Sequence, residues 1–351
     1  MFSAEVIFFT CFTLMIVLML ALDLGVFSKE NHVVKFKEAA GWTSVWVALA
    51  MGFYFFITQY GYLIHDVTSF VDLHNIKKEF GHEFNINILS LSESLANYQK
   101  AIGIEYLTGY LLEYSLSIDN IFVIVLVFGA FGVNEKYFHK ILFWGILGAV
   151  VFRFLFIFLG AALITRFEWI LYLFGLFLVY SGVMMYVKRN AADKVDPDNH
   201  PVVKFASKYL SVSKTAKDGA FFVVENGKRF VTPLFLVLLV VEFTDLIFAV
   251  DSIPAIFGVT KDPYIVFFSN IFAILGLRSL FFLLMNVIHK FRFLKIGLAV
   301  LLIFIGVKML AHHLLNDWGF TTAHSLYVIV AILGGSVLAS ILFPEKEKVS
   351  E

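Results

Sequence analysis

The chain has 351 residues, of which 60% are hydrophobic and only 15% are charged. This composition, with several apolar stretches longer than about 18 residues, excludes a soluble domain and predicts an all-α polytopic membrane protein in a lipid bilayer. The formal net charge is zero, which gives no reason to expect a nucleic-acid partner. The single cysteine, Cys11, excludes a disulfide framework or a thiolate metal cluster.

Nine apolar segments are long enough to be membrane-spanning helices. The first lacks a basic leader and a cleavage site, so we expect it to be a retained span. The nine predicted spans are residues 3–27, 40–64, 101–130, 138–163, 167–187, 231–258, 264–287, 293–315 and 322–343.

The distribution of basic residues predicts the orientation of these spans. With the N-terminus outside, the inside loops and the tail contain nineteen Lys and Arg, whereas the outside segments contain five. Since cytoplasmic loops carry an excess of Lys and Arg, we expect a cytoplasmic C-terminus.

Two connections are long. Residues 65–100 form an outside insert of mixed polarity, and its histidines His65, His74 and His82 lack metal-ligand spacing. Residues 188–230 form a basic inside loop, in which a short hairpin is predicted to turn at Asn226-Gly227, because both positions tolerate positive φ. Neither segment has the pattern of a catalytic domain, and we expect no enzymatic activity.

The chain contains an internal repeat. EYSLSIDNIFVI at 113–124 aligns with DLIFAVDSIPAI at 245–256, and Arg153 and the GVMM at Gly182 align with Arg278 and the GVKM at Gly306. Each copy holds three spans, so the second copy is inverted relative to the first, which is typical of transporters. The expected units are residues 1–64, two helices; 65–100, the insert; 101–187, the first repeat; 188–230, the basic loop; 231–315, the second repeat; and 316–351, the last helix and tail.

The aligned segments carry acids where a spanning helix tolerates them poorly, since one central Asp costs about 2.5–3.5 kcal/mol on insertion scales. Residues seven apart share a helix face, and Pro254 is predicted to break its helix near Asp251. Two broken helices would gather carboxylate, amide, hydroxyl and carbonyl oxygens, a set that suits Mg²⁺, Ca²⁺ or Mn²⁺. The candidate metal ligands are Glu113, Asp119, Asn120, Glu242, Asp245, Asp251 and Ser252. The alternative is that these carboxylates only pair with structural arginines.

Four further residues have open roles. Arg153 and Arg278 are either structural counter-ions or displaceable partners that reset the empty site. Glu105 either lines the exit or lies at the membrane interface, and Asp23 is a gate, an accessory ligand or a helix cap. Because burial favours the neutral form of a carboxylate, some acids are expected to be protonated without metal, which makes proton-for-cation exchange natural.

At these residues the sequence resembles the TerC family of bacterial membrane proteins, particularly its Alx-like branch. The matching segments are ALDLGVF at 21–27, EYLTGYLLEYSLSIDNIFV at 105–123, and the long run from TPLFLVLLVVEFTDLIFAVDSIPAIF to ILGLRS at 232–279. The resemblance implies a bacterial inner-membrane location, a fold similar to the LysE exporter superfamily, and metal-linked roles for the seven candidate ligands. It also implies Mn²⁺ as the transported ion, which the ligand set alone does not select.

The sequence therefore predicts a secondary transporter that exports Mn²⁺ by proton antiport and alternating access of the two repeats. One rival is a membrane factor that buffers or delivers metal without transporting it. A second is an oxyanion exporter, which needs a positive lining, whereas five buried acids face two arginines here. A third, an intramembrane aspartyl protease, lacks a GxGD motif.

Overall fold

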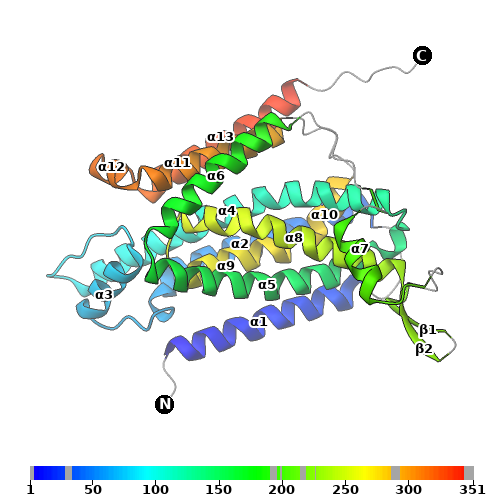
Figure 1. Ribbon diagram of the computed structural model, residues 1–351. Coiled ribbons are helices and arrows are strands. Elements are labelled where there is room, and N and C mark those ends of the chain that lie inside the picture. The colour runs from blue at the N-terminus through cyan, green and yellow to red at the C-terminus, as the bar shows by residue number, and fades with distance from the viewer. Residues whose placement is uncertain are drawn as a thin grey trace.

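The chain forms an elongated bundle of long helices with one small hairpin, as the computed structural model in Figure 1 shows. The structure describes residues 4–27, 34–189, 196–197, 200–213, 219–225, 227–285 and 293–343. Helices α6, α11 and α13 lie together along one side of the bundle, and α1 lies along the opposite side (Figure 1). The long helices are α1 (Ala4–Phe27), α2 (Phe36–Tyr60), α4 (Leu91–Ala130), α5 (Phe138–Arg166), α6 (Ile170–Val187), α8 (Pro233–Phe257), α9 (Pro263–Leu275), α11 (Leu294–Leu310) and α13 (Thr322–Leu342).

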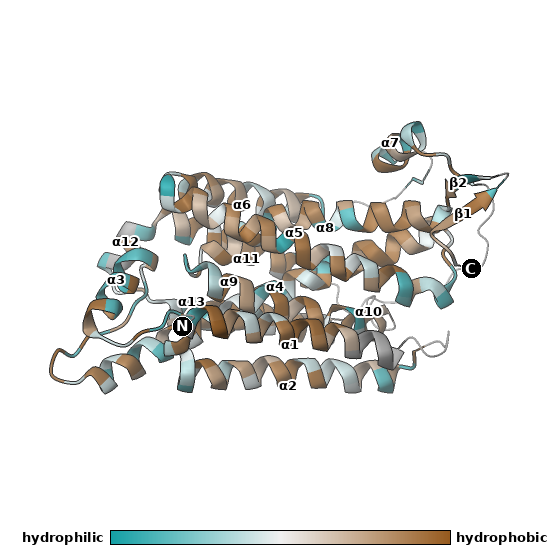
Figure 2. Cartoon of the chain, turned by 90° about the horizontal axis from the view of Figure 1, so that it is seen from below, coloured by the Kyte–Doolittle hydropathy of each residue, from teal (hydrophilic) through white to brown (hydrophobic). Residues whose placement is uncertain are grey.

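The shorter elements occupy the two ends of the bundle. They are η1 (Gly61–Leu63), α3 (Phe70–Phe80), η2 (Glu135–Tyr137), α7 (Pro201–Tyr209), β1 (Phe222–Glu225), β2 (Lys228–Val231), α10 (Leu277–Met285) and α12 (His312–Asp317). Figure 2 shows hydrophilic residues concentrated around α3 and α12 at one end and around α7 and the hairpin at the other. We call the first the insert end and the second the hairpin end.

In the described residues, each of the nine predicted spans contains a helix, but the prediction of nine membrane spans is confirmed only in part. Among the described residues, six helical segments are long and apolar enough to cross a bilayer, and α9 with α10 would make a seventh. In α1, the apolar stretch Glu5–Ala21 is shorter than a full membrane span. The predicted spans 3–27 and 293–315 therefore stay predictions, as do the inverted repeats, the domain boundaries and the orientation.

The prediction that α8 breaks near Asp251 is wrong. Helix α8 continues through Pro254 to Phe257, and α4 is likewise continuous past Ser115. Pro254 lies in the last turn of α8, so only one turn remains beyond the hydrogen bond that it removes. In α4 the hydroxyl of Ser115 donates to the carbonyl of Leu111 at 2.6 Å, a bond compatible with regular helix.

The break lies instead in the following helix of the second repeat. Helices α9 and α10 meet at Gly276 with a bend of 43°. A Cβ at Gly276 would lie 3.3 Å from the Cβ of Trp46 in α2, so the absent side chain lets the bend approach its neighbour.

The most extensive helix packing joins α6 and α11. A Cβ at Gly182 would lie 2.7 Å from the carbonyl oxygen of Ala299, and one at Gly175 would lie 3.0 Å from that of Gly306. Small residues allow two backbones to approach this closely, which favours helix association in membranes. The pairing of 182 with 299 and of 175 with 306 shows that the two helices run antiparallel.

The predicted hairpin is confirmed in the residues described. Strands β1 and β2 pair antiparallel, with Glu225 opposite Lys228. The turn therefore falls at positions 226 and 227, and Gly227 has φ +75°. Asn226 lies outside the described residues.

Candidate functional site

One buried arginine lies among side chains from three other helices. The guanidinium of Arg153 in α5 donates to Glu113 in α4, to Asn270 in α9 over 2.8 Å, and to Asp245 in α8 over 3.4 Å. The amide of Asn270 in turn donates to Glu113 over 3.3 Å. We call Glu113, Arg153, Asp245 and Asn270 the core cluster. Arg153 is thus bound by the two acids that the internal repeat aligns with each other.

Further oxygens of α8 are buried without a hydrogen-bond partner in the described part of the chain. They are one carboxylate oxygen each of Glu242 and Asp245, and the hydroxyl of Ser252. Glu242 lies directly against Gly148 of α5, where any side chain would collide with the carboxylate. These oxygens lie on the same helix as the acid that binds Arg153, and unsatisfied buried oxygens favour a cationic ligand.

The other predicted site residues have different surroundings. Asp251 is half-buried and accepts a hydrogen bond from Ser181 of α6 at 2.8 Å. Asp119 is half-buried in α4, Asn120 beside it is buried, and Arg278 is buried in α10. Asp23 belongs to α1, but its side chain lies outside the described residues.

Of the predicted residues, the structure joins Glu113, Arg153 and Asp245. Within the described ranges, no three His, Cys, Asp or Glu side chains converge as a ready-made metal site. The core cluster in this conformation therefore binds a guanidinium, and a metal would need a rearranged set of ligands.

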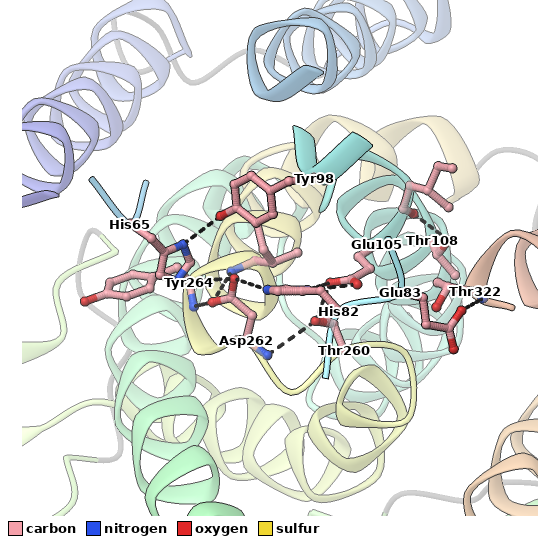
Figure 3. A network of polar contacts seen from close by, with 12 residues as sticks. His65, His82, Glu83, Tyr98, Glu105, Thr108, Thr260, Asp262, Tyr264 and Thr322 are labelled. Atoms are coloured by element: carbon pink, nitrogen blue, oxygen red, sulfur yellow. Dashed lines mark hydrogen bonds and ion pairs between the residues drawn. The ribbon is translucent and has the colours of Figure 1, made fainter. Parts of the chain in front are cut away.

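A second polar cluster lies at the insert end (Figure 3). His82 shares a hydrogen bond with each carboxylate oxygen of Glu105, at 3.0 and 2.9 Å, and Thr260 donates to the same carboxylate at 2.6 Å. The Nε2 atoms of His65 and His82 each lie 3.5 Å from one oxygen of Asp262. His65 also shares a hydrogen bond of 3.0 Å with the Tyr98 hydroxyl. We call these side chains the insert network; its members are His65, His82, Tyr98, Glu105, Thr260 and Asp262.

Neighbouring charges decide the protonation states of His82 and Asp262 in this network. Burial alone lowers the pKa of His82, but the carboxylates of Glu105 and Asp262 outweigh it and raise that pKa to about 10. Burial raises the pKa of Asp262, but His65, His82 and the backbone N–H of Tyr264 outweigh it, so the pKa is lowered. At neutral pH the network therefore contains a protonated His82 between two acids.

The insert network borders two cavities. One, of about 260 Å³, is lined by side chains that include Glu168, Lys261 and Lys308, and the other, of about 240 Å³, by Asn97 and Lys100 among others. Both are lined by Glu83, Glu105 and Thr322. Glu105 is only 4% exposed, although it lines both cavities at the insert end, and its two predicted roles stay predictions.

Comparison with known proteins identifies the family. The sequence model described as "Integral membrane protein TerC family" matches residues 98–348, which is well over half of the chain. The chain belongs to the TerC family. The resemblance expected from the two acidic motifs is thereby confirmed.

Relatives match along nearly the whole length. An uncharacterized membrane protein of Myxococcus xanthus is 42% identical over 331 residues, which cover 94% of this chain and 91% of that relative. A protein of Escherichia coli K12 named "Putative membrane-bound redox modulator Alx" is 40% identical, covering 92% and 90%. A namesake in Salmonella typhi is 41% identical with the same coverage. No solved structure matches this TerC protein.

Sequence reasoning missed Asn270 and most of the insert network. Asn270 follows Ser269 in an otherwise apolar helix, so its isolation in YIVFFSNIFAIL was an available signal. Asp262 stands before Pro263, the signature of a helix start, and accepts from the N–H of Tyr264 at 2.9 Å. The contact of His82 with these elements joins distant parts of the chain and has no local signature.

Proposed function

We propose that this TerC protein is a secondary transporter that exports a divalent cation, Mn²⁺, from the bacterial cytoplasm in exchange for protons. The observation that carries the proposal is the position of Arg153, which Glu113 and Asp245 bind together inside the bundle. Two acids that converge on one positive charge inside the bundle supply the negative charge and the oxygen atoms that a cation needs.

The chemistry of the surrounding atoms favours a hard cation. Carboxylates of Glu113, Glu242 and Asp245, the amide of Asn270 and the hydroxyl of Ser252 provide only oxygen. Mg²⁺, Ca²⁺ and Mn²⁺ prefer such ligands, whereas thiolate and imidazole favour Cu⁺ and Zn²⁺. The choice of Mn²⁺ within this group comes from the family resemblance.

Arg153 fits the role of a displaceable counter-ion. Its guanidinium is always charged, so it competes with any cation for the same carboxylate oxygens. A cation that binds Glu113 and Asp245 must separate them from Arg153, and its release lets Arg153 return. This exchange would return the site to its empty form without leaving two buried acids unpaired.

The packing of α6 against α11 supports the inverted repeat. The alignment that matches Gly182 with Gly306 also matches Gly175 with Ala299. The close approach of Gly175 to Gly306 and that of Gly182 to Ala299 are then the same contact seen from each repeat. Such a two-fold relation is the basis of alternating access in transporters with inverted repeats.

Other functions receive less support. An oxyanion would meet the acids of the core cluster unfavourably. The relatives' name refers to redox modulation, but an intramolecular dithiol needs two cysteines, and this chain has one, Cys11, exposed in α1. A metal-buffering factor would use the same site but would not carry the metal across the membrane.

Flux measurement decides between these functions. Purified protein is placed in liposomes that enclose a Mn²⁺-sensitive dye, and Mn²⁺ is added outside with and without a pH gradient. We expect a pH-dependent rise in the wild type and at least a tenfold loss in Asp245→Asn and Asp251→Asn. The matched control is Glu135→Gln, which removes an exposed acid at the far end of the bundle.

Each outcome has a separate meaning. No flux in the wild type would overturn transport and leave the buffering factor. Normal flux in both site variants would overturn the assignment of α8 as the cation-binding helix. Flux independent of the pH gradient would overturn proton exchange alone.

A further inference from the structure

The insert network joins two parts of the chain that the family comparison separates. Its histidines, His65 and His82, precede the matched range of 98–348, whereas Glu105 and Asp262 lie within it. The insert therefore contributes imidazoles, and the family region contributes carboxylates. Burial of charged side chains costs free energy unless each charge is paired and hydrogen-bonded.

These polar side chains form a continuous series of hydrogen bonds and ion pairs. It runs from the Tyr98 hydroxyl to His65, then to Asp262, His82 and Glu105 (Figure 3). The other oxygen of Asp262 accepts from the backbone at the start of α9, which fixes the carboxylate between the two imidazoles. In the described structure, the two Nε2 atoms and the facing oxygen of Asp262 have no hydrogen-bond partner and meet only as ion pairs of 3.5 Å.

The surroundings of this series are otherwise mostly aromatic. The ring of Phe80 packs on both His65 and His82, and those of Tyr98 and Tyr264 pack on one each. The remaining charged groups near Glu105 face it from the cavities, and they include Glu83 of the insert and Lys308 of α11. Within the described part of the chain, Glu105 is the one member of this series that also lines these two cavities.

The series is coupled to the core cluster by two parallel helices. Glu105 precedes Glu113 by eight residues in α4, and Asp262 precedes Asn270 by eight residues in α9. Eight helical residues span about 12 Å. Between the two levels the helices touch at Gly109, where a Cβ would lie 2.8 Å from the Ser269 hydroxyl. A charge change at Glu105 or Asp262 therefore acts on the same two helices that hold the core cluster.

We propose that the insert network is a proton-exchange site at the insert end, through which this chain takes up the protons that drive export. In the uptake, a hydronium ion in the adjoining cavity loses a proton, and an O–H bond forms on a carboxylate oxygen of Glu105, which becomes neutral. His82 keeps both ring protons and its positive charge, so it then faces one ionised carboxylate, that of Asp262. When Glu105 releases the proton to water, its negative charge pairs with His82 again.

The inference rests on the proposed export function, but it makes a separate claim about the insert. A purely structural latch would use the same contacts to hold the insert on the bundle. The two readings differ in one respect, because a latch needs the hydrogen bonds and not the mobile proton. A variant that keeps the hydrogen bonds and cannot titrate distinguishes them.

The test uses the full chain in liposomes with two dyes, one for Mn²⁺ and one for pH, while a pH gradient is imposed. The variants are Glu105→Gln, which keeps a polar group but has no carboxylate to take up a proton, and His82→Gln, which keeps a polar group but removes the positive charge that pairs with Glu105. The control is His74→Gln, which changes an exposed histidine of the insert. Thermal unfolding of each protein is measured in parallel.

We expect the wild type and His74→Gln to show Mn²⁺ flux that the pH gradient accelerates at least tenfold. His82→Gln and Glu105→Gln should fold and keep the slow flux seen without a gradient, but lose that acceleration and the accompanying proton movement. Acceleration at the wild-type level in both variants would overturn the proposal while leaving export intact. Failure of both variants to fold would also overturn it, because the network would then be a latch. Absence of wild-type flux would instead overturn the proposed function.

Discussion

Replacement of Arg153 by methionine tests whether this arginine and a metal ion compete for one site. The change removes the positive charge bound to Glu113, Asp245 and Asn270 but keeps a long apolar side chain. Removal of one partner from a buried ion pair costs about 3–5 kcal/mol, and because Arg153 serves two acids we expect the upper half of this range. Mn²⁺ should compensate, since ligand at one hundred times its Kd stabilises the folded state by about 2.7 kcal/mol.

The free energy of unfolding can be measured by reversible denaturant titration in mixed micelles, with and without Mn²⁺. The matched control is Arg166→Met, which removes an exposed arginine from the end of the same helix and should change stability by less than about 0.5 kcal/mol. Mn²⁺ should stabilise the Arg153 variant more than the wild type. Equal stabilisation of both proteins, or a loss below about 1 kcal/mol without Mn²⁺, would refute competition between Arg153 and the ion.

Two further predictions concern packing and pH. Gly182→Leu should destabilise the protein by about 1–3 kcal/mol in the same titration, because the new side chain would meet the backbone of α11 at Ala299. The control Gly334→Leu, at an open position of α13, should not destabilise the protein. The pKa of His82 is raised from 6.5 to about 10 in the folded protein, so its contribution to stability is complete below about pH 6.5 and is lost as the pH rises through 10. Thermal unfolding from pH 6.5 to 10.5 should show this loss in the wild type and a weaker dependence in His82→Gln; parallel curves would contradict it.

The sequence predicts the acids of the core cluster because their cost in a membrane is independent of the fold. Glu113 and Asp245 are expensive in any spanning helix, so their presence alone indicates a site. The two acids that the predicted repeat aligns are also the two carboxylates that bind Arg153. What the alignment does not give is the partner from another helix, such as Asn270, because that contact depends on which helices are neighbours.

Local rules were less reliable for helix geometry. The cost of Pro254 is real, but its position in the last turn of α8 limits that cost to one hydrogen bond. The bend occurs at Gly276, where close packing against Trp46 of α2 matters more than any local signal. Tertiary contacts therefore decided between two sequence features that each permit a break.

The core cluster and the insert network have similar arrangements of charge, but they differ in whether that charge can change. Each places a buried, positively charged side chain between two carboxylates, Arg153 in the core and His82 at the insert end. A guanidinium keeps its charge, so the core acids change partners only when atoms move. In the insert network, Glu105 lines a cavity, so a proton can reach this carboxylate and change the charge of the network without moving its atoms. The proposed exchange of a metal for protons needs both properties, and α4 and the start of α9 connect the two clusters to which we assign them.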